Sequence, residues 1–468
     1  MRVPPWLAGP LAAALLIALL PATALAHASL RSADPAAGER LPGPPGDVRL
    51  VLSAPVEDEF LLLEVTDRRG DVVSGPVRRA PGSSRVIVAP VREGARGPLV
   101  VRWRALARDG HVTGGAFGLG AGAAAPEPGE AVVPARSGRG PLTLLARLLV
   151  LGAPLGLLGL VGLAAAVAAP AVRAGGVVAP GEPRAEATRF REAAAAALAG
   201  AAAGWWRAWW ALVAAGAAGL LLAPVATLRE LREGPRALGD LLVGTRAGAA
   251  WWAGVACLAL AALAGLALRS RGRGRTPASA GWAIALGAPP AVALAVLSWS
   301  GHASSGGDRT ANIVIDALHN GATALWIGGL LGLVTLALPA VAALGEADRV
   351  RLAAGVVVRF SAIAMAAVAT LVVTGVYRAL AEASLADLLD TGYGRALVVK
   401  LALFAVLLVG GAYNRMIVHP RLERAALGLD PDDRGAGAAL RTSVRAELIV
   451  AAALLVSVAV LVSLPPPV

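Results

Sequence analysis

The sequence predicts an extracytoplasmic, immunoglobulin-like all-β sandwich followed by an all-α membrane domain of about eight transmembrane helices. Three observations predict this architecture: an apolar composition, short alternating segments near the N-terminus, and long apolar runs in the remainder. Of the 468 residues, 57% are hydrophobic and only 16% are charged, whereas about a quarter are charged in soluble domains. Aromatic residues are scarce and Cys257 is the single cysteine. The composition therefore excludes a purely soluble enzyme, a disordered chain and a disulfide scaffold.

Residues 1–26 are typical of a signal peptide. Arg2 supplies a positive n-region, residues 11–20 an apolar h-region, and Ala24-Leu25-Ala26 an A-x-A cleavage site. Cleavage after Ala26 would make His27 the first residue of the mature chain, and an amino-terminal His offers both its amine and its imidazole to a metal. An uncleaved anchor helix is the alternative.

Residues 27–120 predict the sandwich, because apolar and polar residues alternate there with the period of half-buried strands. Pro and Gly turn signals separate the segments, and this spacing is typical of a β-sandwich. Residues 121–140, rich in Ala, Pro and Gly, predict a flexible linker. The predicted strands are residues 47–52, 61–67, 85–89, 101–105 and 116–120.

Residues 141–468 predict the membrane domain. Arginines concentrate in alternate loops between the apolar runs, so the positive-inside rule places those loops in the cytoplasm and the β-domain outside. The net charge of +12 therefore follows membrane topology and does not indicate a nucleic-acid partner. The runs long enough to cross a bilayer are residues 142–169, 205–223, 245–268, 281–299, 317–343, 355–380, 396–414 and 447–465.

Two further residue types are interpreted from this topology. Tryptophans near the span ends are expected to be interfacial anchors, and His419 is expected to be a polar residue of a cytoplasmic loop. The tryptophans are Trp205, Trp206, Trp209, Trp210, Trp282 and Trp299.

A metal site is predicted in the β-domain at Asp109-Gly110-His111. With the amine and imidazole of His27, Asp109 and His111 offer three nitrogens and one oxygen, the set that Cu(II) prefers. The alternative is a hairpin turn at Asp109-Gly110 followed by a surface histidine. Residues 27–140 contain no Met or Cys, so a soft Cu(I) site there is not supported.

A second group of ionisable residues flanks the loop between the fourth and fifth spans. His302 ends the fourth span, while Asp316 and His319, three residues apart, share one face at the start of the fifth. Because ionisable residues at membrane depth are costly, we expect these three residues to line a metal route. The alternative is a structural polar cluster in which Arg147 or Lys400 pairs with Asp316.

Motifs for nucleotide hydrolysis and for hydrolase chemistry are absent from the sequence. There is no G-x-x-x-x-G-K-[ST], no H-E-x-x-H and no G-x-S-x-G. We therefore expect neither an ATP-driven pump nor an enzyme.

The two parts of the sequence resemble two known protein families. The N-terminal part resembles the CopC copper-binding domain through His27-Ala28-Ser29-Leu30, Leu50-Val51-Leu52-Ser53, Trp103-Arg104 and Asp109-Gly110-His111. The membrane part resembles the CopD family through His302, His319, Trp326-x-Gly328-Gly329, Arg359-Phe360-Ser361, Thr374-Gly375, Tyr393-Gly394, Lys400 and Asn414-Arg415. The resemblance implies a CopC–CopD fusion with a Cu(II) site at His27, Asp109 and His111, in a multi-pass protein of the bacterial plasma membrane with its N-terminal domain on the periplasmic side.

We therefore expect a copper homeostasis protein that binds Cu(II) outside and passes it to the membrane domain for import. Its expected partners are the copper ion and the bilayer, without nucleic acid or ATP, and a homo-oligomer stays open. One alternative is copper resistance by external sequestration, with the membrane domain as anchor or sensor. A copper oxidoreductase built on the two β-domain histidines, and electron transfer through haem held by His302 and His319, are the remaining alternatives.

Overall fold

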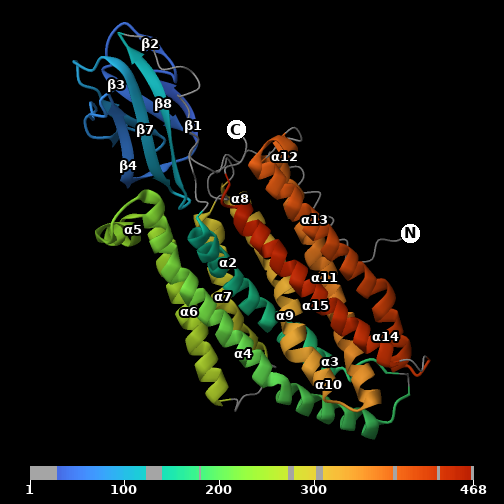
Figure 1. Cartoon of the computed structure of the whole chain (residues 1–468). Coiled ribbons are helices and arrows are strands. Elements are labelled where there is room, and N and C mark those ends of the chain that lie inside the picture. The colour runs from blue at the N-terminus through green and yellow to red at the C-terminus, as the bar shows by residue number, and fades with distance from the viewer. Residues whose placement is uncertain are drawn as a thin grey trace.

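A computed structural model shows a β-domain seated on one end of a helical bundle (Figure 1). The signal peptide, His27, most of the predicted linker and His302 lie outside the described residues, so their predictions stay untested. The structure describes residues 29–122, 140–178, 181–271, 279–301, 309–382, 387–429 and 433–464.

The β-domain is a sandwich of two four-stranded sheets within the described residues, as predicted. One sheet has the order β1 (Leu30–Asp34), β3 (Asp47–Leu52), β6 (Val86–Pro90) and β5 (Arg78–Arg79). The other has the order β2 (Arg40–Leu41), β8 (Val112–Ala121), β7 (Gly97–Ala107) and β4 (Val56–Thr66). Alternate residues of each sheet face inward: Val48, Leu50 and Leu52 of β3 are buried between the sheets with Val101 and Trp103 of β7. This core follows from the period of two.

The helical part contains eight helices long and apolar enough to cross a membrane, counted over the described residues. This agrees with the predicted number. Five are α4 (Arg184–Leu231), α6 (Arg246–Arg271), α7 (Ala280–Ser300), α11 (Glu346–Glu382) and α15 (Asp433–Leu461). The first and fifth spans contain π-helical turns. The first span is α2 (Pro141–Gly162), which continues through η1 (Leu163–Ala168) into α3 (Ala169–Arg173). The fifth span is one continuous rod made of α8 (Arg309–Thr323), η4 (Ala324–Gly328), α9 (Gly329–Gly332), η5 (Leu333–Ala337) and α10 (Leu338–Ala342). The seventh joins α13 (Gly392–Tyr413), η6 (Asn414–Val418) and α14 (His419–Ala426); short elements are η2 (Pro235–Ala237), α5 (Leu238–Gly244) and α12 (Asp387–Asp390).

Two glycines let α2 and η4 touch backbone to backbone. A Cβ atom added to Gly159 would lie 2.3 Å from the Cα atom of Gly328, well inside van der Waals contact. Only glycine permits this approach, in the manner of small-residue contacts between membrane helices. The contact draws the first and fifth spans together at the centre of the bundle.

The tryptophan prediction is wrong for three residues of α4. Trp205, Trp206 and Trp209 are 0%, 2% and 0% exposed, and they belong to the core of the bundle. The indole of Trp205 donates to the carbonyl oxygen of Leu160 at 3.1 Å. The reason is that α4 begins at Arg184, about twenty residues before the predicted span, because Ala-rich sequence of low hydropathy is nonetheless strongly helical.

The prediction for His419 is also wrong. His419 begins α14 and is 6% exposed. Its Nδ1 atom accepts from the guanidinium of Arg415 at 2.8 Å, one helical turn earlier. The residue is therefore a helical core histidine and not part of a loop.

The β-domain packs directly against the bundle. Phe60, Leu106 and Val112 of the β-domain form one buried layer with Leu228, Leu231 and Leu241 of the helical part, here called the docking layer. At the edge of this layer the backbone amide of Arg246 donates to Oε1 of Glu57 at 2.9 Å. Burial raises the pKa of the Glu57 carboxyl above its ordinary value, against the lowering effect of that hydrogen bond.

Candidate metal site

The Asp109-Gly110-His111 segment is the turn between β7 and β8. Gly110 has a φ of +82°, which suits glycine. The amide of His111 donates to Oδ1 of Asp109 at 3.1 Å, an aspartate turn that fixes the carboxylate beside the ring. The hairpin turn of the alternative interpretation is present, but the histidine that follows it is not on the surface, because His111 is 9% exposed.

The bundle completes the surroundings of His111. Its Nε2 lies 3.1 Å from the carbonyl oxygen of Val462, just beyond α15. Because a carbonyl only accepts, Nε2 carries the proton of the neutral ring and Nδ1 presents its lone pair. Nδ1 lies 3.2 Å from Oδ1 of Asp109. The pKa of His111 is held well below its ordinary value, first by burial and then by the charge of Arg147, so the imidazole is neutral and able to bind a metal.

The Asp109 carboxylate is suited to a cation. Its side chain is 2% exposed, and Oδ2 is buried without a hydrogen-bond partner among the described residues. A buried carboxylate oxygen in this state is costly, and a cation bridging Asp109 and the His111 ring would offset that cost. Over the described ranges no group of three or more His, Cys, Asp or Glu side chains is gathered, so the predicted set needs His27, which lies outside them.

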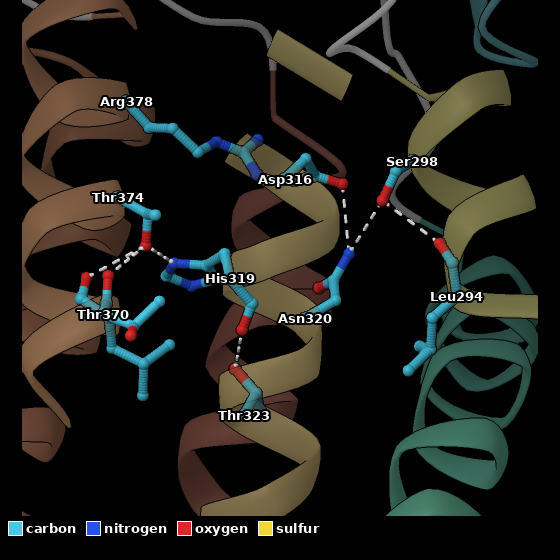
Figure 2. A network of polar contacts seen from close by, with 10 residues as sticks. Leu294, Ser298, Asp316, His319, Asn320, Thr323, Thr370, Thr374 and Arg378 are labelled. Carbon is cyan, nitrogen blue, oxygen red and sulfur yellow. Dashed lines mark hydrogen bonds and ion pairs between the residues drawn. The ribbon is translucent and has the colours of Figure 1, made fainter. Parts of the chain in front are cut away.

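The second predicted group lies on α8. Figure 2 shows Asp316, His319 and Asn320 projecting from this helix toward α11 on one side and α7 on the other. The Asn320 amide donates to Oδ2 of Asp316 at 3.0 Å and to Oγ of Ser298 at 3.2 Å. Asp316 forms an ion pair with Arg378 of α11. Arg378 is therefore a partner of Asp316 that the sequence analysis did not propose.

The ring of His319 is oriented by Thr374. Nδ1 of His319 lies 2.8 Å from the Thr374 hydroxyl, which donates its single hydrogen to the carbonyl of Thr370 at 2.7 Å (Figure 2). The hydroxyl oxygen therefore accepts from Nδ1, and the lone pair of a neutral ring is on Nε2. A hydrogen bond of this kind is the usual way in which proteins orient a metal-binding imidazole.

Thr374 and Arg378 were not among the predicted site residues. They lie four residues apart on α11, hence on one helix face. An arginine near a span end was the available signal. This arginine could not be assigned as the partner of Asp316 from the sequence, because several basic residues lie at comparable positions near span ends.

One cavity joins the two groups. It has a volume of about 460 Å³, and both the Asp109–His111 turn and the α8 group of Asp316 and His319 are in its wall. Most of its other lining is apolar. Its remaining charged and polar lining includes Thr143, Arg147, Glu230, Asn320, Arg378 and Lys400. Gly301, the last described residue before His302, also lines it.

The fold and the cavity define a multi-span membrane protein whose β-sandwich and helical bundle share one cavity. Family models identify both parts: residues 30–121 match the CopC domain, and residues 354–461 match copper resistance protein D. The protein thus contains a CopC and a CopD domain in one chain, which indicates a role in copper resistance or transport. Asp109 and His111 lie within the first match, Thr374 and Arg378 within the second, and residues 141–353 outside both.

No curated protein matches the chain. The crystal structure of CopC from Methylosinus trichosporium OB3b is 26% identical in sequence; the match covers 22% of this chain and 97% of that chain, with a TM-score of 0.20.

Proposed function

We propose that this protein imports copper: the β-domain captures Cu(II) outside the cell and passes it to the membrane domain. The protein acts as a carrier and not as an enzyme. The observation that supports this proposal is the cavity of about 460 Å³ whose wall contains both Asp109 and His111 of the β-domain and Asp316 and His319 of α8. A copper ion leaving the β-domain can therefore reach the α8 group through this shared cavity.

Capture requires a complete ligand set. Asp109 and the neutral imidazole of His111 are adjacent at 3.2 Å, and the amine and imidazole of His27 would supply the other two nitrogens. Asp316 and His319 also offer a carboxylate and an imidazole ligand to the ion. Because donor and acceptor sites use the same ligand types, transfer does not require a change of copper chemistry.

The cavity wall balances its own charge. Asp109, Glu230 and Asp316 supply three carboxylates, and Arg147, Arg378 and Lys400 supply three cationic side chains. A balanced wall neither traps a divalent ion nor excludes it. Since the sequence has no ATP-binding motif, copper would move down its own gradient.

The proposed orientation places the β-domain outside. Arginines concentrate at the helix ends away from the β-domain, which is the arrangement expected of a cytoplasmic face. They include Arg173, Arg184, Arg269, Arg349, Arg351, Arg421 and Arg424.

The test is total cell copper, measured by mass spectrometry in cells with and without the protein at fixed external copper. Import predicts a rise that His319→Gln abolishes, because Gln keeps a donor for Thr374 but offers no imidazole nitrogen. His419→Gln is the matched control, since His419 is a buried membrane histidine outside this cavity, and it should leave the rise intact. A fall in cell copper would contradict import and favour export or external sequestration.

A further inference from the structure

A second cavity, also of about 460 Å³, occupies the other half of the bundle. Its wall includes Val341 of α10 and Arg415 of η6, and Figure 1 shows α10 and the adjoining α14 at the end away from the β-domain. Most of the wall is apolar. Its acidic residue is Glu447 of α15, which lies outside the proposed copper route.

Glu447 is a buried acid at membrane depth. It is 6% exposed, and no ion pair joins it to any residue that the structure describes. Its Oε1 atom accepts from the Asn414 amide and, at 3.4 Å, from the Ser443 hydroxyl. Arg415 also lines the cavity, but its guanidinium donates to His419. An ionisable residue held in this way is expensive and indicates a function.

The neighbouring helix α13 has a glycine, Gly410, where it contacts the Glu447 side chain. A Cβ atom added to Gly410 of α13 would lie 3.2 Å from Cγ and 3.3 Å from Oε1 of Glu447. Gly411, the next residue, has nothing within 4 Å of such an atom. Substituting Gly410 by Ala would therefore crowd Glu447, whereas substituting Gly411 by Ala would not, so the second substitution is a matched control for the first.

Other electron-pair donors share this cavity. Oδ1 of Asn414 is buried and has no hydrogen-bond partner among the described residues, and the thioether of Met365 belongs to the same wall. The thioether is the copper ligand of this set, and the two oxygens can complete its coordination. We propose that Glu447, Asn414 and Met365 form a second copper-binding site, on the far side of the membrane domain, which receives the ion from the Asp316–His319 group. This inference rests on the proposed copper transport.

Trp326 lies in the wall of the second cavity, about one helical turn after the last fifth-span residue that lines the first. Along the fifth span, Thr323 lines the first cavity and Trp326 the second. The indole is 3% exposed and packs edge-on against Phe404, with ring centroids 5.9 Å apart. About one helical turn of the fifth span therefore lies between the two cavity linings, and the Trp326–Phe404 pair packs at that level.

The first experiment measures copper bound to the purified full-length protein by equilibrium dialysis and mass spectrometry. In a His27→Gln/Asp109→Asn/His111→Gln/His319→Gln background, which removes side-chain ligands of both other sites, we expect one copper ion to remain bound. Adding Glu447→Gln should weaken its binding about 10- to 100-fold, a range typical for loss of groups that support a metal. Gly410→Ala should weaken it in the same direction, and Gly411→Ala should not. Unchanged binding in the Glu447→Gln variant overturns the second site.

A second variant controls for loss of binding that is caused by misfolding. Glu447→Asp keeps the carboxylate, so it should retain measurable copper binding where Glu447→Gln does not. If both variants fold, as judged by an unchanged elution volume, and bind copper equally, the carboxylate is not a ligand and the inference is wrong.

Cell copper distinguishes this inference from the proposed function. If His319→Gln abolishes accumulation while Glu447→Gln changes neither accumulation nor binding, import stands and the second site is refuted. If Glu447→Gln abolishes accumulation but leaves copper binding at the β-domain intact, the second site is supported. If neither variant affects accumulation, the route through the bundle is refuted together with the second site.

Discussion

Truncating Phe60 should separate the β-domain from the bundle without unfolding it. Phe60 is 8% exposed and belongs to the docking layer, not to the core between the two sheets. A fully buried Phe→Ala change costs about 3–5 kcal/mol. Because the docking layer contains only six buried side chains among the described residues, we expect Phe60→Ala to cost about 2–3 kcal/mol. At about 1.4 kcal/mol per factor of ten, the docked-to-undocked ratio falls about 30- to 140-fold.

The assay is amide hydrogen exchange of the full chain in detergent, read by mass spectrometry. Exchange should rise in the β7–β8 turn and in α5, which lie on the two sides of the contact, while β3 stays protected. Phe117→Ala is the control, since Phe117 is 2% exposed within the sandwich core and its loss should weaken protection throughout the sandwich. Unchanged exchange at the turn and α5 in Phe60→Ala would refute the energetic role of this layer, and so would loss of protection in β3.

Three further changes test other contacts. Because burial raises the pKa of Glu57, the folded carboxyl holds its proton more tightly than the unfolded one. Its stabilisation is therefore present at low pH and lost as the pH rises through the raised pKa. Glu57→Gln should gain Tm relative to the parent chain as the pH rises above the ordinary carboxyl pKa of 4.5. Trp205→Phe removes a buried donor and should cost about 2–4 kcal/mol of unfolding free energy in a denaturation series, whereas Trp210→Phe should cost less than about 1 kcal/mol. Thr374→Val removes the group that orients the membrane-domain imidazole and should weaken copper binding there about 10- to 100-fold; Thr370→Val, whose hydroxyl donates within its own helix, should not.

Periodic features were predictable from the sequence. The inward positions of β3 follow from alternation, and the eight membrane-length helices follow from apolar runs. The i,i+3 spacing of Asp316 and His319 placed them on one face of α8 before any contact was known. Each of these inferences depends only on residues close together in the chain.

The errors arose where distant segments meet. Trp205 was expected at the interface because a hydropathy window ends there, yet the Ala-rich start of α4 extends the helix and Trp205 packs against α2. Arg378 was missed because its pairing with Asp316 depends on how α8 and α11 pack together. His419 was assigned to a loop because it lies beyond the apolar run of residues 396–414, yet the helix continues past that run, and Pro420 occupies the first turn of α14, where proline is tolerated.

The sequence by itself determined the two domain types, their order, and most of the candidate ligands, because strand period, span length and ligand chemistry are local properties of the chain. Only the tertiary structure decided that Asp109, His111, Asp316 and His319 line one cavity, and that Glu447 occupies another. The docking layer and the Gly159–Gly328 contact set these distances. Both join residues far apart in sequence, whose packing depends on complementary shapes that no local pattern encodes.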